Sequence, residues 1–397
     1  MRKALLSEVV DINPETLSLS ASGSFRFRYI DLSAVSRGQI FWNSLETHLR
    51  TSAPSRAQRL VRPNDCLLGT VRPLQQSHGY IEETGEALVA STGFAVLRAK
   101  DGIAHPRFIY HWMLGSSALR QTDAMAVGSN YPAVNESDVA NLRIDLPSIG
   151  QQRRIAEILD TVDAYIDVSS DLVAKLLSLR TDLLEHLFSE KRWPTVRLGE
   201  ICKITSGTTP SRAEGERYFA PKGIPWVKTL DLNEGTIVDA DEKVTFEAVR
   251  DLRLRILPPG TVLVAMYGGW EQIGRTALLG VSATTNQAIC ALEASGELLP
   301  EFLLRALQQK RRQWRKIAAS TRKDPNITKR DVHTFQVPMP PVQDQERIIR
   351  SYSSHLERIT NEIQSKNRLE IFKRGLMEDL LTGRVRVPQA EAVLEDL

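Results

Sequence analysis

One stretch of the chain is rich in side chains that bind anions. Residues 300–330 contain ten lysines and arginines but only two acidic residues, Glu301 and Asp324. Such a local excess of positive charge is well suited to phosphates, although a basic helix can also simply face solvent. Within this stretch the candidates for contact with phosphates or bases are Lys310, Arg311, Arg315, Arg322, Lys323 and Asn326. We assign most of the cations to phosphates, and Arg322 and Asn326 to base recognition.

A second group of polar residues lies on predicted loops. The segment 206–212 reads Ser-Gly-Thr-Thr-Pro-Ser-Arg, and its hydroxyls and amides could meet phosphates or base edges. Gly268 and Gly269, followed by Trp270, predict a tight turn with an aromatic anchor. The candidate binding residues of the second half are completed by Thr208, Thr209, Arg212, Lys228, Tyr267 and Gln287. The first half offers a thinner set, namely Arg26, Arg28, Arg72 and Gln75.

No catalytic centre is visible in the sequence. It contains no phosphate-binding GxxxxGK[ST] loop, no GxGxxG turn, no HExxH zinc helix and no GxSxG elbow. The seven histidines are scattered, without a pair at metal-ligand spacing. We therefore predict no catalytic residue, no metal ligand and no cofactor for this chain. Cys66, Cys202 and Cys290 are far apart, and we expect reduced, buried thiols.

Composition indicates an ordinary globular protein. The 397 residues predict two or three domains, and the net charge of +3 does not by itself require a nucleic-acid partner. No stretch approaches the roughly 18 apolar residues of a membrane span. We expect a cytoplasmic protein that has no contact with a membrane.

The elements that must position the candidate residues occur twice. The segment from Asn135 through Pro147 to Ile155 is matched by the segment from Thr328 through Pro340 to Ile348. Equivalent residues, such as Gln152 and Gln345, are 193 residues apart, so the chain is a large internal duplication. Similar frames that carry dissimilar loops are expected of two related readers of different targets.

Each repeat ends in a long helical pattern. After Pro147, apolar residues recur at alternating steps of three and four, which predicts one helix of roughly 40 residues. This seam comprises Ile155, Ile158, Val162, Tyr165, Leu172, Leu176, Leu179 and Leu183. The second seam, from Ile349 through Ile363, resumes out of phase at Leu369, so we expect a kink or a new packing face near Lys366. The two helices can pair as an antiparallel coiled coil; alternatively, each packs on its own domain.

The segments before the helices carry short β-rich runs, and each closes with a helical pattern, residues 106–119 and 300–317. We therefore predict a mixed α/β fold with a pseudo-two-fold duplication. The expected parts are a first globule at 1–147, a long helix at 148–190, a second globule at 191–340, a second long helix at 341–383 and a poorly ordered tail at 384–397.

These features resemble the DNA-specificity subunit of Type I restriction-modification systems. The resemblance rests on the paired segments that open the two long helices, beginning at Pro147 and Pro340, and on three islands at residues 206–211, 224–227 and 286–288. It covers nearly the whole chain, in the order globule, helix, globule, helix. Ser148 replaces a proline of the first motif, Thr261 stands where the family often has Asp, and the islands of the first globule are faint.

The resemblance implies a non-catalytic subunit whose globules are target-recognition domains. Each would read one half of a split sequence in double-stranded DNA, while the helices set the spacing. Methyltransferase subunits would dock on the chain, and ATP-dependent restriction subunits could join them. The assembly would use S-adenosylmethionine, ATP and Mg²⁺, none held by this chain. Two other readings are a stand-alone nuclease or methyltransferase with a duplicated core, and a coiled-coil adaptor that binds only proteins.

Overall fold

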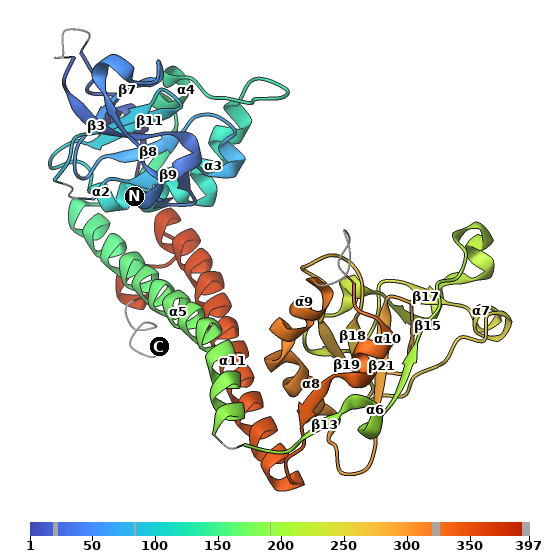
Figure 1. Cartoon of the computed structure of the whole chain (residues 1–397). Helices are drawn as coiled ribbons and strands as arrows, with labels where there is room; N and C mark the ends of the chain where they lie inside the picture. Colours follow the sequence, from blue (N-terminus) through green and yellow to red (C-terminus); the bar gives the residue numbers. More distant parts are fainter. Residues whose placement is uncertain (19–22, 83–84, 191, 320–325, 391–397) are drawn as a thin grey trace. The chain divides into compact units, whose positions relative to one another are not determined.

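The computed structural model describes residues 1–18, 23–82, 85–190, 192–319 and 326–390 (Figure 1). The chain divides into two compact units, one formed by Met1–Asp171 with Ile363–Leu397 and the other by Leu172–Glu362. Each unit contains a mixed α/β globule and one section of each long helix. These helices are α5 (Ile149–Ser189) and α11 (Val342–Thr382), each of 41 residues, which confirms the predicted length.

The first globule contains two four-stranded sheets, with strand orders β6-β3-β10-β7 and β2-β11-β8-β9. Its strands are β1 (Arg2–Leu5), β2 (Val10–Ile12), β3 (Arg26–Ile30), β4 (Val35–Ser36), β5 (Gln39–Ile40), β6 (Thr47–Leu49), β7 (Ala57–Val61), β8 (Cys66–Gly69), β9 (His78–Tyr80), β10 (Leu88–Ser91), β11 (Phe94–Ala99) and β12 (Arg143–Leu146). Its helices are α1 (Leu6–Val9), α2 (Pro106–Leu114), α3 (Ser116–Met125) and α4 (Glu136–Ala140).

The second globule contains a five-stranded sheet, β14-β21-β18-β19-β16, and a three-stranded sheet, β17-β15-β20. Its strands are β13 (Thr195–Arg197), β14 (Cys202–Ser206), β15 (Phe219–Val227), β16 (Thr236–Ile237), β17 (Lys243–Val244), β18 (Val262–Ala265), β19 (Thr276–Leu279), β20 (Thr284–Thr285), β21 (Ile289–Ala294) and β22 (Gln336–Pro338). Its helices are α6 (Leu198–Ile201), α7 (Phe246–Asp251), α8 (Pro300–Gln309), α9 (Arg311–Ala319) and α10 (Lys329–Thr334).

The repeated sequence segments close each globule in the same way. The first strand of each globule pairs antiparallel with its last, β1 with β12 and β13 with β22. Just before that last strand, a capping box begins a short helix, from Asn135 and Asp138 in α4 and from Thr328 and Asp331 in α10. Because such boxes satisfy the free N–H groups of a helix start, they explain why this pattern recurs.

A buried glutamine attaches each globule to its long helix. The side chain of Gln152 donates to the carbonyls of Ile103 and Pro147, at 3.0 Å each, and accepts from the His105 amide at 2.8 Å. In the second unit the same three bonds are made by Gln345, which donates to the carbonyls of Glu297 and Pro340 and accepts from the Leu299 amide. Both glutamines are fully buried, so these bonds replace solvation of the loops that precede α2 and α8.

We expect Gln152→Ala to destabilise the first unit by about 2–4 kcal/mol, because it leaves buried backbone groups without partners. Urea unfolding of the whole chain measures the change. The matched control is Gln364→Ala, at an exposed position of α11, which should change stability by less than about 0.5 kcal/mol. Equal effects of the two substitutions would contradict the proposed attachment.

The two long helices pair antiparallel within each unit, as the sequence predicts. In the first unit Lys373 of α11 pairs with Asp163 of α5. In the second unit the His355 ring lies 2.9 Å from the Leu176 carbonyl oxygen, and Arg347 pairs with Glu190 at 2.6 Å. Early residues of one helix therefore meet late residues of the other.

The observed seams have alternating steps of three and four throughout, as in coiled coils. Their buried and half-buried positions are residues 152, 155, 159, 162, 166, 169, 173, 176, 180, 183 and 187 of α5, and those 193 residues later in α11. The expected change near Lys366 is therefore wrong: α11 is continuous and its seam keeps its spacing. Glu362, Lys366 and Lys373 occupy seam positions. A count of apolar residues overlooks them, because long charged side chains can bury their apolar stems.

Other expectations also fail in detail. Tyr165 and Leu179, assigned to the first seam, are 57% and 42% exposed. The single helices expected at 106–119 and 300–317 are each two helices, broken at Gly115 and Lys310. Of the tail that was expected to be poorly ordered, Ala390 is buried in the core of the first unit, and residues 391–397 lie outside the described residues.

Candidate nucleic-acid interface

Three segments that are distant in sequence meet at one surface of the second globule. The Thr208 amide donates to the Thr285 carbonyl at 3.0 Å, and the Trp226 indole donates to the Thr208 carbonyl at 3.2 Å. The amide of Asn286 donates to the Val227 carbonyl at 3.1 Å. Together these bonds join the loop after β14, the end of β15 and the loop after β20, the three islands that the sequence singled out.

Glycine is required at position 207 of this surface. A Cβ atom there would lie only 1.8 Å from the Thr285 carbonyl oxygen, which is backbone and cannot move aside cheaply. The absence of a side chain thus lets the β14 loop approach β20 closely. It also leaves the hydroxyls of Thr208 and Thr209 at an exposed edge.

Polar side chains on this surface are held in place by one another. The Thr209 hydroxyl donates to the side-chain carbonyl of Gln287, so the Gln287 amide group keeps its own donors. The Arg212 guanidinium lies 4.5 Å from the centre of the Phe219 ring and also bonds Glu242 at 3.0 Å. Gln287 and Arg212 are exposed, as readers of a groove must be.

Glu242 was not predicted, yet it organises two of the predicted cations. Its carboxylate pairs with both Arg212 and Lys228. Hydrogen bonds from Arg212 and Lys228 lower the pKa of Glu242 to about 2, so the carboxylate stays ionised at neutral pH. A second carboxylate, that of Asp231, accepts from the Lys228 amide at 2.7 Å, so the two cations are held between two anions at this edge.

Backbone hydrogen bonds of Met266 bring two further candidates, Tyr267 and Asn326, close to the loop that carries Gln287. The Met266 amide donates to the Ala288 carbonyl at 2.8 Å, and its carbonyl accepts from the Ile327 amide at 3.0 Å. Tyr267 directly follows Met266, and Asn326 directly precedes Ile327. The Tyr267 side chain is 40% exposed. Arg322 and Lys323 lie outside the described residues.

The Gly268–Gly269 turn presents an aromatic residue that the prediction left out of the interface. Both glycines have positive φ, +114° and +79°, which favours glycine at these positions. Trp270, directly after them, is 44% exposed. The sequence signal was present, since the turn was predicted, but exposure of its tryptophan could not be read from sequence.

The cationic helix α9 presents only part of its charge to solvent. Arg311 bonds the Glu234 carboxylate at 2.5 Å and the Glu271 carbonyl at 2.7 Å, and burial lowers its pKa. Lys310 is half-buried, and burial lowers its pKa too. Trp314 is fully buried and stacks on Phe335 with 3.6 Å between ring centres, so it belongs to the core. The exposed cations of α9 are Arg312, Arg315 and Lys316.

The candidates of the first globule lie on two elements. Arg26 is exposed on β3, whereas Arg28 is half-buried, bonds the Trp42 carbonyl and lies 3.6 Å from the Glu86 carboxylate. Arg72 and Gln75 lie on the turn between β8 and β9, where both are exposed. The Arg72 guanidinium stacks over Tyr131 at 4.5 Å.

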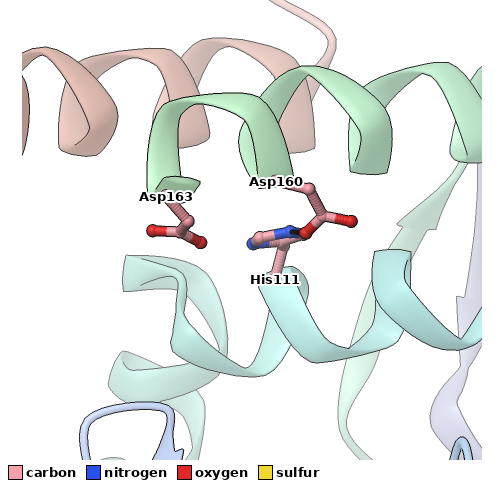
Figure 2. Close-up of side chains that lie close together, drawn as sticks. All are labelled: His111, Asp160 and Asp163. Carbon is pink, nitrogen blue, oxygen red and sulfur yellow. Dashed lines mark hydrogen bonds and ion pairs between the residues drawn. The ribbon is translucent and has the colours of Figure 1, made fainter. Parts of the chain in front are cut away.

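A cluster of charged side chains that the sequence did not predict lies in the first unit, where α2 meets α5 (Figure 2). The His111 Nε2 atom lies 2.7 Å from Asp160 Oδ1, and Arg107 bonds both oxygens of Asp160. Burial alone would raise the pKa of Asp160, but the hydrogen bonds from His111 and Arg107 outweigh it and lower the pKa to about 2. Burial lowers the pKa of His111.

The chain matches the family model described as the Type I restriction modification DNA specificity domain over residues 63–177 and 190–371. It is 22% identical over 331 residues to the specificity subunit of the Type I restriction enzyme MjaVIII of Methanocaldococcus jannaschii, covering 76% of each chain. It is 21% identical over 238 residues to the MjaIX specificity subunit of the same organism, a match of 55% of this chain and 54% of that protein. The match thus spans about half the length of this second relative.

Solved structures agree on the fold. The HsdS subunit from Thermoanaerobacter tengcongensis superposes with a TM-score of 0.59 at 24% identity, covering 97% of each chain. A chain from a study of complex assembly and conformational transition of the type I R-M system gives a TM-score of 0.70 at 24% identity, covering 96% of this chain and 97% of that one. Because the family model covers most of its length, the chain belongs to the Type I restriction-modification DNA-specificity family. Among the described residues, no helix has the length and apolarity needed to cross a membrane.

Proposed function

We propose that this chain is the sequence-recognition subunit of a Type I restriction-modification complex. Each globule reads one half of a bipartite target in double-stranded DNA, and α5 and α11 set the spacing between the halves. The observation that carries the proposal is the meeting of three distant loops at one exposed surface that presents Thr209, Arg212 and Gln287. Hydroxyl, guanidinium and amide groups are the groups that read base edges and hold phosphates.

The chain itself is proposed to be non-catalytic. Methyltransferase subunits, which would bring S-adenosylmethionine, would dock on the globules and on the long helices. ATP-dependent restriction subunits, which require ATP and Mg²⁺, could join that assembly. Gln152 and Gln345 are buried and fully hydrogen-bonded, which supports a rigid attachment of each globule to the helices. Helices can set a fixed spacing between two half-sequences only if the globules are attached rigidly.

Gln287→Ala tests base reading by the second globule. The amide of Gln287 can form paired hydrogen bonds with adenine, a contact that contributes about 1–3 kcal/mol of discrimination against a wrong base. We expect the methylated motif to relax at one position of one half-sequence. The measurement is methylome sequencing of cells that express the variant with its methyltransferase subunit. Gln364→Ala is the control, and an unchanged motif in an active Gln287→Ala variant would remove Gln287 from the interface.

The exposed cations of α9 are proposed to contact phosphates. A triple variant, Arg312→Ala with Arg315→Ala and Lys316→Ala, should bind target and scrambled duplexes less tightly by a similar factor. Its salt dependence should be shallower by up to about 0.9 in log–log slope for each lost contact, because fewer counterions are released. The measurement is the affinity of the assembled methyltransferase across a salt series.

Arg311→Ala is the informative comparison, because Arg311 is engaged by Glu234 inside the unit. Its effect should fall on stability, with the salt slope retained. If the triple variant keeps the parental slope, α9 faces a protein partner or solvent instead of DNA.

A further inference from the structure

The cluster of His111, Asp160 and Asp163 has the arrangement of a histidine poised to bind a metal ion. One ligand atom from each residue lies within 4.8 Å of the others. The ring lies between the two carboxylates, with Nε2 against Asp160 and its other nitrogen on the side of Asp163 (Figure 2). That other nitrogen, Nδ1, is buried and has no hydrogen-bond partner, in a side chain with no solvent exposure.

The contact with Asp160 determines which nitrogen is available. The contact between Nε2 and the Asp160 carboxylate is satisfied by an N–H at Nε2, so in the tautomer that can bind a metal ion the lone pair lies on Nδ1. Histidines that bind metals almost always donate their other ring N–H to a carboxylate or carbonyl in this manner. Arg107 bonds both oxygens of Asp160, so that carboxylate is already compensated and is suited to orient the ring.

A cation is already stabilised beside Asp163, namely the ammonium of Lys373 from α11. Asp163 and Lys373 also line a cavity of about 740 Å³ in the first unit, together with Asp167. The cavity reaches the cluster on the side of Asp163, where it gives water molecules room to complete the coordination of an ion; His111 itself does not line it. Because a lysine side chain is long and flexible, its ammonium can leave Asp163 for this cavity when another cation takes its place.

The second copy of the fold does without this cluster. Pro106 and Pro300 open α2 and α8, so His111 corresponds to Arg305, and Asp163 corresponds to Leu356 at the 193-residue offset. There the Arg305 guanidinium stacks over Tyr352 at 4.6 Å. A globule can thus attach to the long helices without a histidine between two carboxylates. The fold therefore does not require the cluster of His111, Asp160 and Asp163.

We propose that His111 Nδ1 and the Asp163 carboxylate bind a first-row divalent cation of the Zn²⁺ or Co²⁺ class, with Asp160 orienting the imidazole. Imidazole nitrogen and carboxylate oxygen suit these ions, and water completes the coordination. The bound ion joins α2 of the globule to α5 and replaces the ion pair between Lys373 and Asp163. It therefore couples metal binding to the packing of α11 in the first unit.

The test is titration of the full chain, stripped of metal with a chelator, with ZnCl₂ by calorimetry and with CoCl₂ by visible absorption. One equivalent should bind, and Co²⁺ should give a d–d band of a protein-bound ion. Asp163→Asn should weaken binding at least about tenfold, and Asp160→Asn by about 10–100-fold. Lys373→Met should strengthen binding because it removes the competing ammonium. Asp171→Asn, an exposed residue of the same helix, is the control and should bind like the parent.

His111→Gln should abolish the Co²⁺ band, with folding checked by circular dichroism. If that variant does not fold, Asp163→Asn and Lys373→Met still decide the matter. The proposal is overturned if neither the parent nor Lys373→Met binds one equivalent. It is equally overturned if Asp163→Asn binds as the parent does, since the ion would then occupy surface groups.

Discussion

Lengthening both long helices by one heptad should widen the gap in the DNA motif while leaving both half-sequences unchanged. Seven residues add about 10 Å of helix at 1.5 Å each. Along the DNA axis, at about 3.4 Å per base pair, this corresponds to about three base pairs. The insertions belong after Asp171 in α5 and after Glu362 in α11, where the chain passes from one unit to the other. A heptad is chosen because the seam repeats every seven residues. Residues at seam positions of one helix therefore still face seam positions of the other.

The control carries the same insertion in α5 alone. Because the seam would then be out of register on one side, this variant should lose stability and methylation, with no new gap. Methylome sequencing reports the motif of each variant. An active double-insertion variant with the parental gap would show that the helices do not set the spacing.

Exchange of the first globule should replace one half-sequence completely. The junction lies between Leu146, the end of β12, and Ile149, the start of α5, so residues 1–146 can be replaced as a closed body. The donor must supply the loop that bonds Gln152, and it must accept Ala390, which packs in the core of this unit. We expect a hybrid motif in which the half read by the second globule is retained.

Methylome sequencing of cells that express the exchanged chain measures this outcome. A chain that carries the donor globule with Gln152→Ala is the matched control, and it should methylate poorly because the attachment is lost. A change in both halves of the motif would contradict independent reading by the two globules.

The repeated parts of the fold could be predicted because their physical reasons are local. The capping boxes at Asn135 and Thr328, and the heptad steps of α5, are patterns that a short stretch of sequence specifies. The helix breaks at Gly115 and Lys310 were missed because each follows a continuous amphipathic pattern. Tertiary packing decides such breaks, since the next helix must turn to bury Trp314 in the second unit.

The candidate interface was predictable by residue type but only partly by geometry. The islands around Thr208, Trp226 and Gln287 were recognised, and the structure brings them together. The role of Glu242, which holds Arg212 and Lys228, depends on β15 pairing with β17, a contact made across the sheet. Arg311 was assigned to phosphates because its charge was counted without its partner Glu234, which is 77 residues away. The His111 cluster joins α2 to α5 across 49 residues and has no local signature.

The proposed recognition of a split DNA sequence is tested most directly by methylome sequencing of cells that carry the gene for this chain together with the methyltransferase subunit proposed to dock on it, compared with cells that lack only this gene. We expect an asymmetric motif of two half-sequences separated by an unspecified gap, methylated in the first cells and unmethylated in the second. Methylation of the same motif in the absence of this chain, or methylation without any motif in its presence, would contradict the account.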